Sequence, residues 1–241
     1  MGIVNVTPDS FSDGGQFFKP EEAIRRAKNL IADGADIIDL GGESTRPGAT
    51  PIGWEEEWAR IEPVLTGLTS FVSRLKSFQI SVDTYHPETA AKAIAAGAHV
   101  INCVYAEPIP EMLKLLEGND VELVLPYRIG GKDVGREMED VSTASRLYLD
   151  PMIGFGTTRE EDVELLRSIP ELAKKGRVLV GASRKRIVKK LVGEKCAVGK
   201  NIGGNVAIAV WAAMQGASVV RVHDVKETVQ ALRVVDALGE R

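Results

Sequence analysis

The chain has 241 residues, of which 44% are hydrophobic and 27% charged, and this balance indicates a globular protein able to bury a full core. A formal net charge of −4 argues against a nucleic-acid-binding surface, so any anion site must be local. No apolar run reaches membrane-spanning length, and Cys103 and Cys196 fit neither a zinc-binding spacing nor a disulfide framework. We therefore expect a cytoplasmic protein that binds small molecules and neither nucleic acid nor membrane.

Strand-like apolar runs alternate with amphipathic helix-like segments along the chain. In chain order, the pattern predicts strands at Gly2–Val6, Ala35–Leu40, Gln79–Val82, His99–Asn102, Glu122–Leu125, Arg146–Leu149, Arg177–Val180 and Ser218–Val222. It predicts helices at Pro20–Gly34, Glu55–Leu68, Pro87–Ala96, Ile109–Leu116, Glu160–Lys174, Gly204–Gln215 and Val225–Ala237. Asp224 and Glu227 have the spacing of a capping box at the start of the last helix.

Eight strands with helices between them and no linker predict a single α/β domain over residues 1–241, a (β/α)₈ TIM barrel. The alternative is an open doubly wound sheet, but no Gly-x-Gly-x-x-Gly turn follows the first strand. The segment Gly130–Ser145 is short and polar where a crossover helix is expected, so that helix is stunted or residues are missing.

Polar side chains follow nearly every predicted strand, and active sites of such barrels lie at the carboxyl ends of the strands. A single residue of this kind is as easily a helix cap or a solvated loop residue, but solvated loops do not explain a full ring. The ring consists of Asn5, Thr45, Arg46, Asp83, Asn102, Arg128, Asp150, Lys185, Arg221 and His223.

The ring divides by chemistry into two halves. Asp83, Asn102 and Asp150 offer oxygens to a flat heterocycle with N–H donors, and Lys185 can contact a ring carbonyl or nitrogen. Arg221, His223 and Asn5 suit the oxygens of a phosphate, and the first and last strands of a closed barrel are neighbours. An anion-binding role is favoured for His223 over a general base because Arg221 is so close.

Two early loops, residues 7–15 and 41–49, are rich in Gly, Ser and Asp. They are long enough to fold over a bound ligand and exclude water, although ordinary turns have the same composition.

Six motifs spread over most of the chain resemble those of the dihydropteroate synthase family, in that family's order. They are Asn5-Val-Thr-Pro-Asp-Ser-Phe-Ser-Asp-Gly-Gly15, Asp39-Leu-Gly-Gly-Glu-Ser-Thr-Arg-Pro-Gly-Ala49, Ile80-Ser-Val-Asp-Thr84, Leu149-Asp-Pro with Ile153-Gly-Phe-Gly156, Ser183-Arg-Lys185 and Arg221-Val-His-Asp224.

The resemblance implies an enzyme of folate biosynthesis that joins 6-hydroxymethyl-7,8-dihydropterin pyrophosphate to para-aminobenzoate and releases pyrophosphate, usually with Mg²⁺. It also implies an SN1-like mechanism, in which pyrophosphate leaves before the aniline nitrogen attacks, and it makes a homodimer possible. The implied pterin-binding residues are Asp83, Asn102, Asp150 and Lys185, of which Asp83, Asp150 and Lys185 are expected to be catalytic. The implied pyrophosphate-binding residues are Asn5, Arg221 and His223, with Asn5 near the metal, and the implied aminobenzoate-binding residues are Thr45, Arg46 and Ser183.

Several positions depart from the family pattern, and they cluster on the fourth to sixth strands. Cys103 stands where the family usually has Asp, Met152 where it has Gly, and Thr157 where it has Lys. The segment Leu125–Gly130 replaces a Met-His-Met-Gln-Gly-like run and adds Arg128. We expect Cys103 to be a buried neutral thiol, and Met152 to fill part of the space that glycine leaves open.

Three interpretations remain open. The favoured one is a divergent active dihydropteroate synthase. The second is a methyltetrahydropterin-dependent corrinoid methyltransferase, which does not need the first loop or the Arg221–Asp224 motif. The third is a repurposed barrel, natural or engineered, that binds a phosphorylated ligand without the condensation.

Overall fold

The computed structural model describes residues 1–7, 19–44, 49–72, 78–129, 132–133, 144–193 and 201–239. Hydrogen bonding orders eight strands as β1-β2-β3-β4-β5-β8-β9-β10, which is their order along the chain. This order, with helices between the strands, confirms the predicted (β/α)₈ fold. The chain divides into two compact units, Gly2–Leu123 and Val124–Arg241 with Met1. None of the described helices has the length and apolar character needed to cross a membrane.

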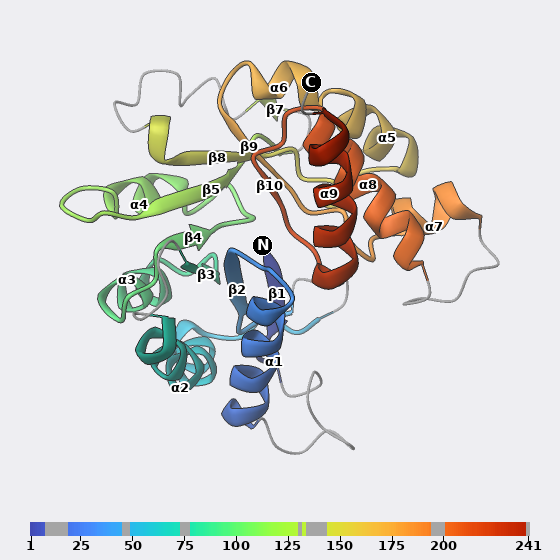
Figure 1. Ribbon diagram of the computed structural model, residues 1–241. Helices are drawn as coiled ribbons and strands as arrows, with labels where there is room; N and C mark the ends of the chain where they lie inside the picture. Colours follow the sequence, from blue (N-terminus) through green and yellow to red (C-terminus); the bar gives the residue numbers. More distant parts are fainter. Residues whose placement is uncertain are drawn as a thin grey trace. The chain divides into compact units, whose positions relative to one another are not determined.

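In the unit Gly2–Leu123, parallel strands alternate with helices that pack side by side, α1 against α2 and α2 against α3 (Figure 1). Its elements are β1 (Gly2–Asn5), α1 (Pro20–Ala32), β2 (Ile37–Gly41), α2 (Trp54–Val72), β3 (Gln79–Asp83), α3 (Pro87–Ala95), β4 (Val100–Asn102) and α4 (Ile109–Lys114).

Helix α1 illustrates why these segments form where they do. Pro20 stands in its first turn, where no backbone N–H is needed, and Glu21 and Glu22 complement the positive end of the helix dipole. Ala23, Ala27 and Leu30 lie on one face and are buried. The helix ends before Gly34, whose φ of +101° favours glycine.

The unit Val124–Arg241 begins within β5 (Glu122–Pro126) and continues with short elements. They are β6 (Arg128–Ile129), β7 (Lys132–Asp133), the 3₁₀ helix η3 (Ala144–Arg146), β8 (Leu147–Asp150), α5 (Arg159–Arg167), α6 (Ile169–Ala173), β9 (Arg177–Val180), α7 (Arg186–Val192), α8 (Ile202–Met214), β10 (Val219–Val220) and α9 (Val225–Gly239). Helix α8 packs against α7 and α9 (Figure 1). Met1 belongs with β10, because its amino group donates to the Val220 carbonyl and its carbonyl accepts from the Val222 N–H, each at 3.0 Å.

Two sequence-based expectations need correction. The predicted helix Glu160–Lys174 is two helices, α5 and α6, divided at Ser168, because Pro170 cannot donate the backbone hydrogen bond that a continuous helix requires. The prediction of a stunted crossover helix or missing residues in Gly130–Ser145 stays a prediction, because only residues 132–133 and 144–145 of this segment are described, and there β7 pairs antiparallel with β6. The carboxylate of Asp224 binds Asn205 and Arg184 instead of forming the predicted capping box with Glu227.

Met152, which stands where the resembled family usually has glycine, has a strained backbone. Its φ of +63° is in the left-handed region that favours glycine, yet its side chain is buried. The burial agrees with the expectation that Met152 fills space that a glycine leaves open.

This strain predicts that Met152→Gly is more stable than Met152→Ala, although glycine usually destabilises a folded chain relative to alanine. Met152→Ala and Met152→Gly both remove the buried side chain, but only glycine relieves the strain. We expect the glycine variant to have the higher free energy of unfolding, by about 1 kcal/mol, in urea titrations. An alanine variant as stable as the glycine variant would contradict this account.

Candidate functional site

The unit Gly2–Leu123 places three of the predicted site residues in one row. Parallel register aligns Asn5 with Gly41, Gly41 with Asp83, and Asp83 with Asn102, at the carboxyl ends of β1 to β4. A methyl group added to Gly41 would lie 3.6 Å from Asn5 Oδ1 and 3.8 Å from Asp83 Cβ. The glycine therefore separates two half-exposed polar side chains that lie on the same side of the sheet.

A buried carboxylate fixes the orientation of Asn102. Asp39, inside β2, accepts hydrogen bonds from Ser81 Oγ at 2.5 Å and from Asn102 Nδ2 at 3.3 Å. With the amide nitrogen used in this way, Asn102 Oδ1 is buried and has no hydrogen-bond partner among the described residues. Such an oxygen is suited to an N–H donor of a ligand.

A second buried carboxyl group supports the residue after Asp83. Thr84 Oγ1 donates to Glu57 Oε2 at 2.6 Å, and the Thr84 N–H donates to the Asn102 carbonyl at 3.0 Å. Burial raises the pKa of Glu57, while hydrogen bonds from Thr84 and Thr89 act in the opposite direction. Glu57 thereby fixes Thr84, which follows Asp83 in the chain and is hydrogen-bonded to the backbone of Asn102.

Asp150, at the end of β8, has an exposed fraction of 5% and is the most buried ionisable group among the predicted site residues whose side chains the structure describes. Burial raises the pKa of its carboxyl group, and the charges of Lys185 and Arg221 and a hydrogen bond from the Met152 N–H at 2.7 Å lower it. The charges of Lys185 and Arg221 therefore both act on Asp150. The expectation that acidic and basic strand ends share one site stays a prediction, which this electrostatic influence on Asp150 supports.

Lys185 lies across the loop that follows Asp150. Its Nζ donates to the Ile153 carbonyl at 2.6 Å and lies 4.3 Å from the centre of the Phe155 ring. Thr157, where the resembled family has Lys, accepts from the Gly154 N–H at 3.1 Å and donates to buried Asp162 at 2.6 Å. In this chain Thr157 and Asp162 therefore hold the loop on which Lys185 rests.

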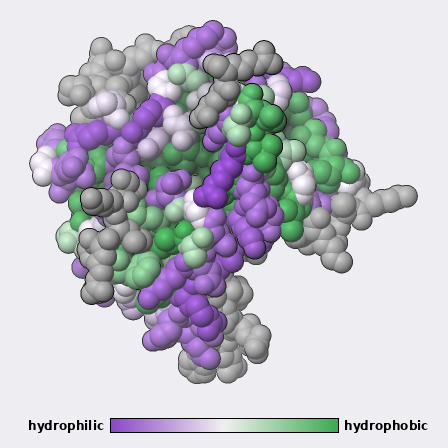
Figure 2. Space-filling model, in the orientation of Figure 1, coloured by the Kyte–Doolittle hydropathy of each residue, from purple (hydrophilic) through white to green (hydrophobic). Residues whose placement is uncertain are grey.

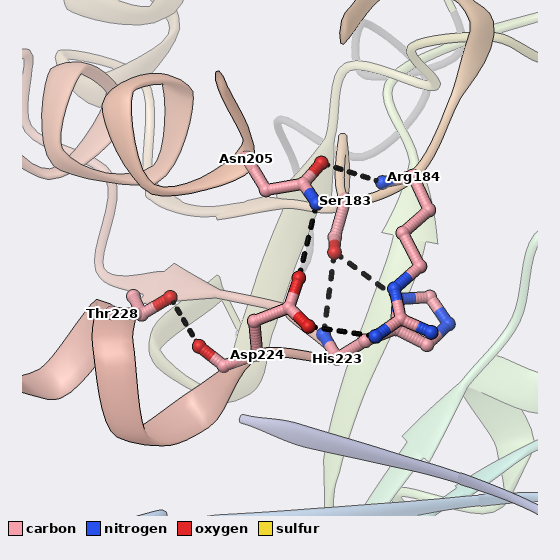
Figure 3. A network of polar contacts seen from close by, with 6 residues as sticks. All are labelled: Ser183, Arg184, Asn205, His223, Asp224 and Thr228. Atoms are coloured by element: carbon pink, nitrogen blue, oxygen red, sulfur yellow. Dashed lines mark hydrogen bonds and ion pairs between the residues drawn. The ribbon is translucent and has the colours of Figure 1, made fainter. Parts of the chain in front are cut away.

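Ser183 and His223 meet at the ends of β9 and β10 (Figure 3). Ser183 Oγ accepts from the His223 N–H at 3.3 Å and lies 3.1 Å from His223 Nδ1. Arg221 borders Gly181, where an added methyl group would lie 3.8 Å from Arg221 Cβ and Cδ. The second unit therefore gathers a buried carboxyl, two cations, a hydroxyl and an imidazole.

Cys103 confirms the expectation of a neutral thiol. It is buried, its Sγ donates to the Tyr105 carbonyl at 3.3 Å, and burial raises its pKa to about 12.

Some predictions fall outside the described residues. Thr45 and Arg46 do, as do Cys196, most of the loop 7–15 and most of the segment 130–145, and nothing is described of the Arg128 side chain.

Sequence reasoning missed Asp39, Glu57 and Asn205 as parts of the site. Asp39 carried a signal, because a carboxylate inside the apolar run of β2 needs a partner. Glu57 belongs to an acidic run at the start of α2, a pattern typical of a solvated first turn. Asn205 carried no signal, because it depends on which loop packs against α8.

Comparison with known proteins places the chain in a family. The model of the family described as pterin binding enzyme matches residues 1–129 and 132–223. A dihydropteroate synthase of Staphylococcus haemolyticus is 36% identical over 257 residues, which cover 100% of this chain and 94% of the relative.

Two solved structures of Xanthomonas albilineans dihydropteroate synthase have the same fold. The structure with 4-aminobenzoic acid has a TM-score of 0.88 and 40% identity, and covers 99% of this chain and 92% of that chain. The structure in complex with 7,8-dihydropteroate has a TM-score of 0.84 and 35% identity, with coverage of 100% and 93%.

The raised pKa of Asp150 predicts a pH dependence of stability. The folded state holds this proton more tightly than the unfolded chain does, so stability relative to Asp150→Asn should fall as pH rises. The fall should begin near the ordinary value of 3.8 and end at the raised pKa. Lys185→Met removes a charge that lowers the pKa of Asp150, so in its presence the fall in stability should extend to higher pH. The comparison uses Lys185→Met with and without Asp150→Asn.

Urea titrations at a series of pH values measure this difference. Lys174→Met, which removes an exposed lysine paired with Glu171, is the matched control and should leave the fall in place. A fall that does not respond to Lys185→Met would disprove the electrostatic link.

Proposed function

We propose residue roles and a mechanism for this chain on the premise that it belongs to the pterin-binding enzyme family and, within it, to the dihydropteroate synthases. It is a transferase of folate biosynthesis that condenses a pterin with para-aminobenzoate. The proposed substrates are 6-hydroxymethyl-7,8-dihydropterin pyrophosphate and para-aminobenzoate, and the products are 7,8-dihydropteroate and pyrophosphate. The observation that supports the roles is the buried Asp150 carboxyl group, whose pKa is lowered by the charges of both Lys185 and Arg221 against the effect of burial.

The proposed pterin-binding residues are Asp83, Asn102, Asp150 and Lys185. The unpartnered Asn102 oxygen and the two carboxyl groups match the N–H donors on the edge of an aminopyrimidinone ring. The ammonium group of Lys185 lies beside the Phe155 ring, and it can donate to a carbonyl or ring nitrogen of a flat heterocycle.

The proposed pyrophosphate-binding residues are Asn5, Arg221 and His223. A guanidinium group suits phosphate oxygens, and His223 stands just before α9, whose amino end favours an anion. Ser183, together with Thr45 and Arg46, is proposed to shape the aminobenzoate site.

The proposed reaction is SN1-like. The bond between the pterin methylene carbon and the pyrophosphate oxygen breaks, and pyrophosphate keeps the electron pair. The aniline nitrogen then bonds to the methylene carbon and loses a proton. Arg221 stabilises the leaving negative charge, while Asp83 and Asp150 favour the positive charge on the pterin, so these carboxylates and Lys185 are the proposed catalytic residues.

Magnesium is proposed as the cofactor, and the residues present fit that ion. Mg²⁺ prefers oxygen ligands and is commonly held by one or two protein groups, water and substrate phosphates. Asn5 offers a half-exposed side-chain oxygen, and the described residues contain no cluster of three His, Cys, Asp or Glu that would form a protein cage. Bound beside Asn5, the ion would supply charge that neutralises pyrophosphate.

A homodimer through α7, α8 and α9 is also proposed. Helix α8 has no charged residue, and its outward residues Trp211 and Met214 are 47% and 64% exposed. Figure 2 shows apolar surface in the region of α8, next to hydrophilic surface over part of α9. A helix that is apolar all round is normally buried, and a face without charges can pack against a copy of itself. The exposed large apolar residues of these three helices, here called the apolar patch, are Leu191, Val192, Ile202, Trp211, Met214, Val234 and Leu238.

A cytoplasmic location remains proposed, and the unpaired thiol of Cys103 is consistent with a reducing compartment. The matches to dihydropteroate synthases favour the first of the three interpretations over the corrinoid methyltransferase and the repurposed barrel.

The proposed function predicts that the protein catalyses the condensation. Pterin pyrophosphate, para-aminobenzoate and Mg²⁺ supplied together should yield pyrophosphate and 7,8-dihydropteroate in equal amounts, measured by a coupled pyrophosphate assay and chromatography. Arg221→Ala should weaken binding of pterin pyrophosphate about 10- to 100-fold, because a charged hydrogen-bond donor is lost, while bare pterin binds as before.

Two outcomes would contradict this account. Pterin binding without turnover would favour the repurposed barrel, and methyl transfer to a corrinoid protein would establish the methyltransferase. Equal losses of both ligands in Arg221→Ala would remove the pyrophosphate-binding role from that residue.

The proposed dimer predicts a response to charge on α8. Trp211→Glu combined with Met214→Glu should shift the protein from dimer to monomer in sedimentation velocity, since two buried carboxylates per copy would lack partners. Tyr105→Glu, at an exposed aromatic residue outside the patch, should leave the dimer intact. A wild-type protein that sediments as a monomer would overturn the proposal.

A further inference from the structure

Asn205 is a buried polar residue in an otherwise apolar helix. Its exposed fraction is 4%, and Ile208, Ala209 and Ala212 share its buried face of α8. A side-chain amide buried among such residues is costly unless its oxygen and nitrogen both find partners. The partners of Asn205 therefore indicate what the residue is for.

The two ends of the amide bind two different loops. Asn205 Oδ1 accepts from the Arg184 backbone N–H at 2.9 Å, and Nδ2 donates to Asp224 Oδ2 at 3.0 Å (Figure 3). The first partner can only donate and a carboxylate can only accept, so the amide has one orientation.

Arg184 closes the network and bears backbone strain. Its φ is +61°, in the left-handed region that an arginine adopts only when its surroundings impose it. Its guanidinium group binds Asp224 Oδ1 at 2.7 Å, so Asn205, Arg184 and Asp224 form a ring of three contacts. The backbone and the side chain of Arg184 are both fixed by this ring.

The ring connects both loops of the proposed site. Arg184 lies between Ser183 and Lys185 after β9, and Asp224 directly follows His223 after β10. Ser183 and His223 contact each other beside the ring, as Figure 3 shows. Moving Asn205 would therefore shift residues proposed for the pterin, the aminobenzoate and the pyrophosphate together.

We propose that Asn205 is a positioning residue for the condensation, which sets the loop of Ser183 and Lys185 against the loop of Arg221 and His223. It acts through Arg184 and Asp224, and no substrate contact is assigned to it. The inference rests on the proposed function, because the residues it positions are those proposed to bind the substrates.

Three variants test this role, and a fourth serves as a control. Asn205→Ala removes both contacts. Asn205→Asp keeps the shape, but when ionised it cannot donate to Asp224. Asn205→Asp with Asp224→Asn exchanges acceptor and donor and keeps the net charge of the ring. Asn119→Asp, which adds the same charge at an exposed asparagine, is the control.

Asn205→Ala should lose about 10- to 100-fold in kcat/KM while it stays folded by circular dichroism, because small misplacements of reacting groups cost that much. It should also bind inorganic pyrophosphate more weakly in calorimetry.

Asn205→Asp should show a comparable loss at about pH 8 that diminishes as pH falls, because the protonated acid can donate to Asp224. The kcat/KM of Asn205→Asp is divided by that of the wild type at each pH. This ratio cancels the effects of His223, Lys185 and other groups that both proteins share. The exchanged double variant should recover most of the activity at about pH 8.

A purely structural role would lower the melting temperature without producing the new pH dependence or the recovery. Unchanged kcat/KM in Asn205→Ala, an Asn205→Asp ratio that is flat with pH, or a folded double variant that is not rescued would each overturn the proposal. Absence of turnover in the wild type would instead count against the proposed function, and the calorimetry would still test Asn205.

Discussion

The electrostatic balance around Asp150 is the constraint on which the second unit depends. A carboxyl group with an exposed fraction of 5% has lost most of its hydration, and nearby cations offset that loss only in part, since its pKa remains raised. Lys185 and Arg221 in turn stand near the ends of β9 and β10, so the three strand ends are coupled through charge. Removing either cation changes the environment of Asp150.

The same residue accounts for the strain in the loop that follows it. Asp150 Oδ1 accepts the Met152 N–H at 2.7 Å, and this bond holds Met152 in a conformation that favours glycine. Strain is therefore stored next to a residue proposed to bind pterin, and burial of the Met152 side chain compensates for it. The departure from the family pattern at this position affects backbone freedom as well as the volume of the side chain.

Sequence reasoning located the strand ends, because buried parallel strands leave continuous apolar runs that stop abruptly at polar residues. It therefore placed Asn5, Asp83 and Asn102 on one edge, and the register confirms this. It could not find Asn205, whose role depends on the loops packed against α8 and on no local pattern. It also joined α5 to α6, because apolar periodicity continues across Pro170 although the backbone hydrogen bonding cannot.

Helix α8 links two proposals that rest on different observations. Its inner face carries Asn205, which binds the loops after β9 and β10, and its outer face carries Trp211 and Met214. A helix with ordered hydrogen bonds moves as one body, so a partner bound to the outer face would also restrict the position of Asn205. On this reasoning the Trp211 and Met214 substitutions that separate the proposed dimer should also lower kcat/KM, and by less than Asn205→Ala, because they leave the ring around Arg184 intact.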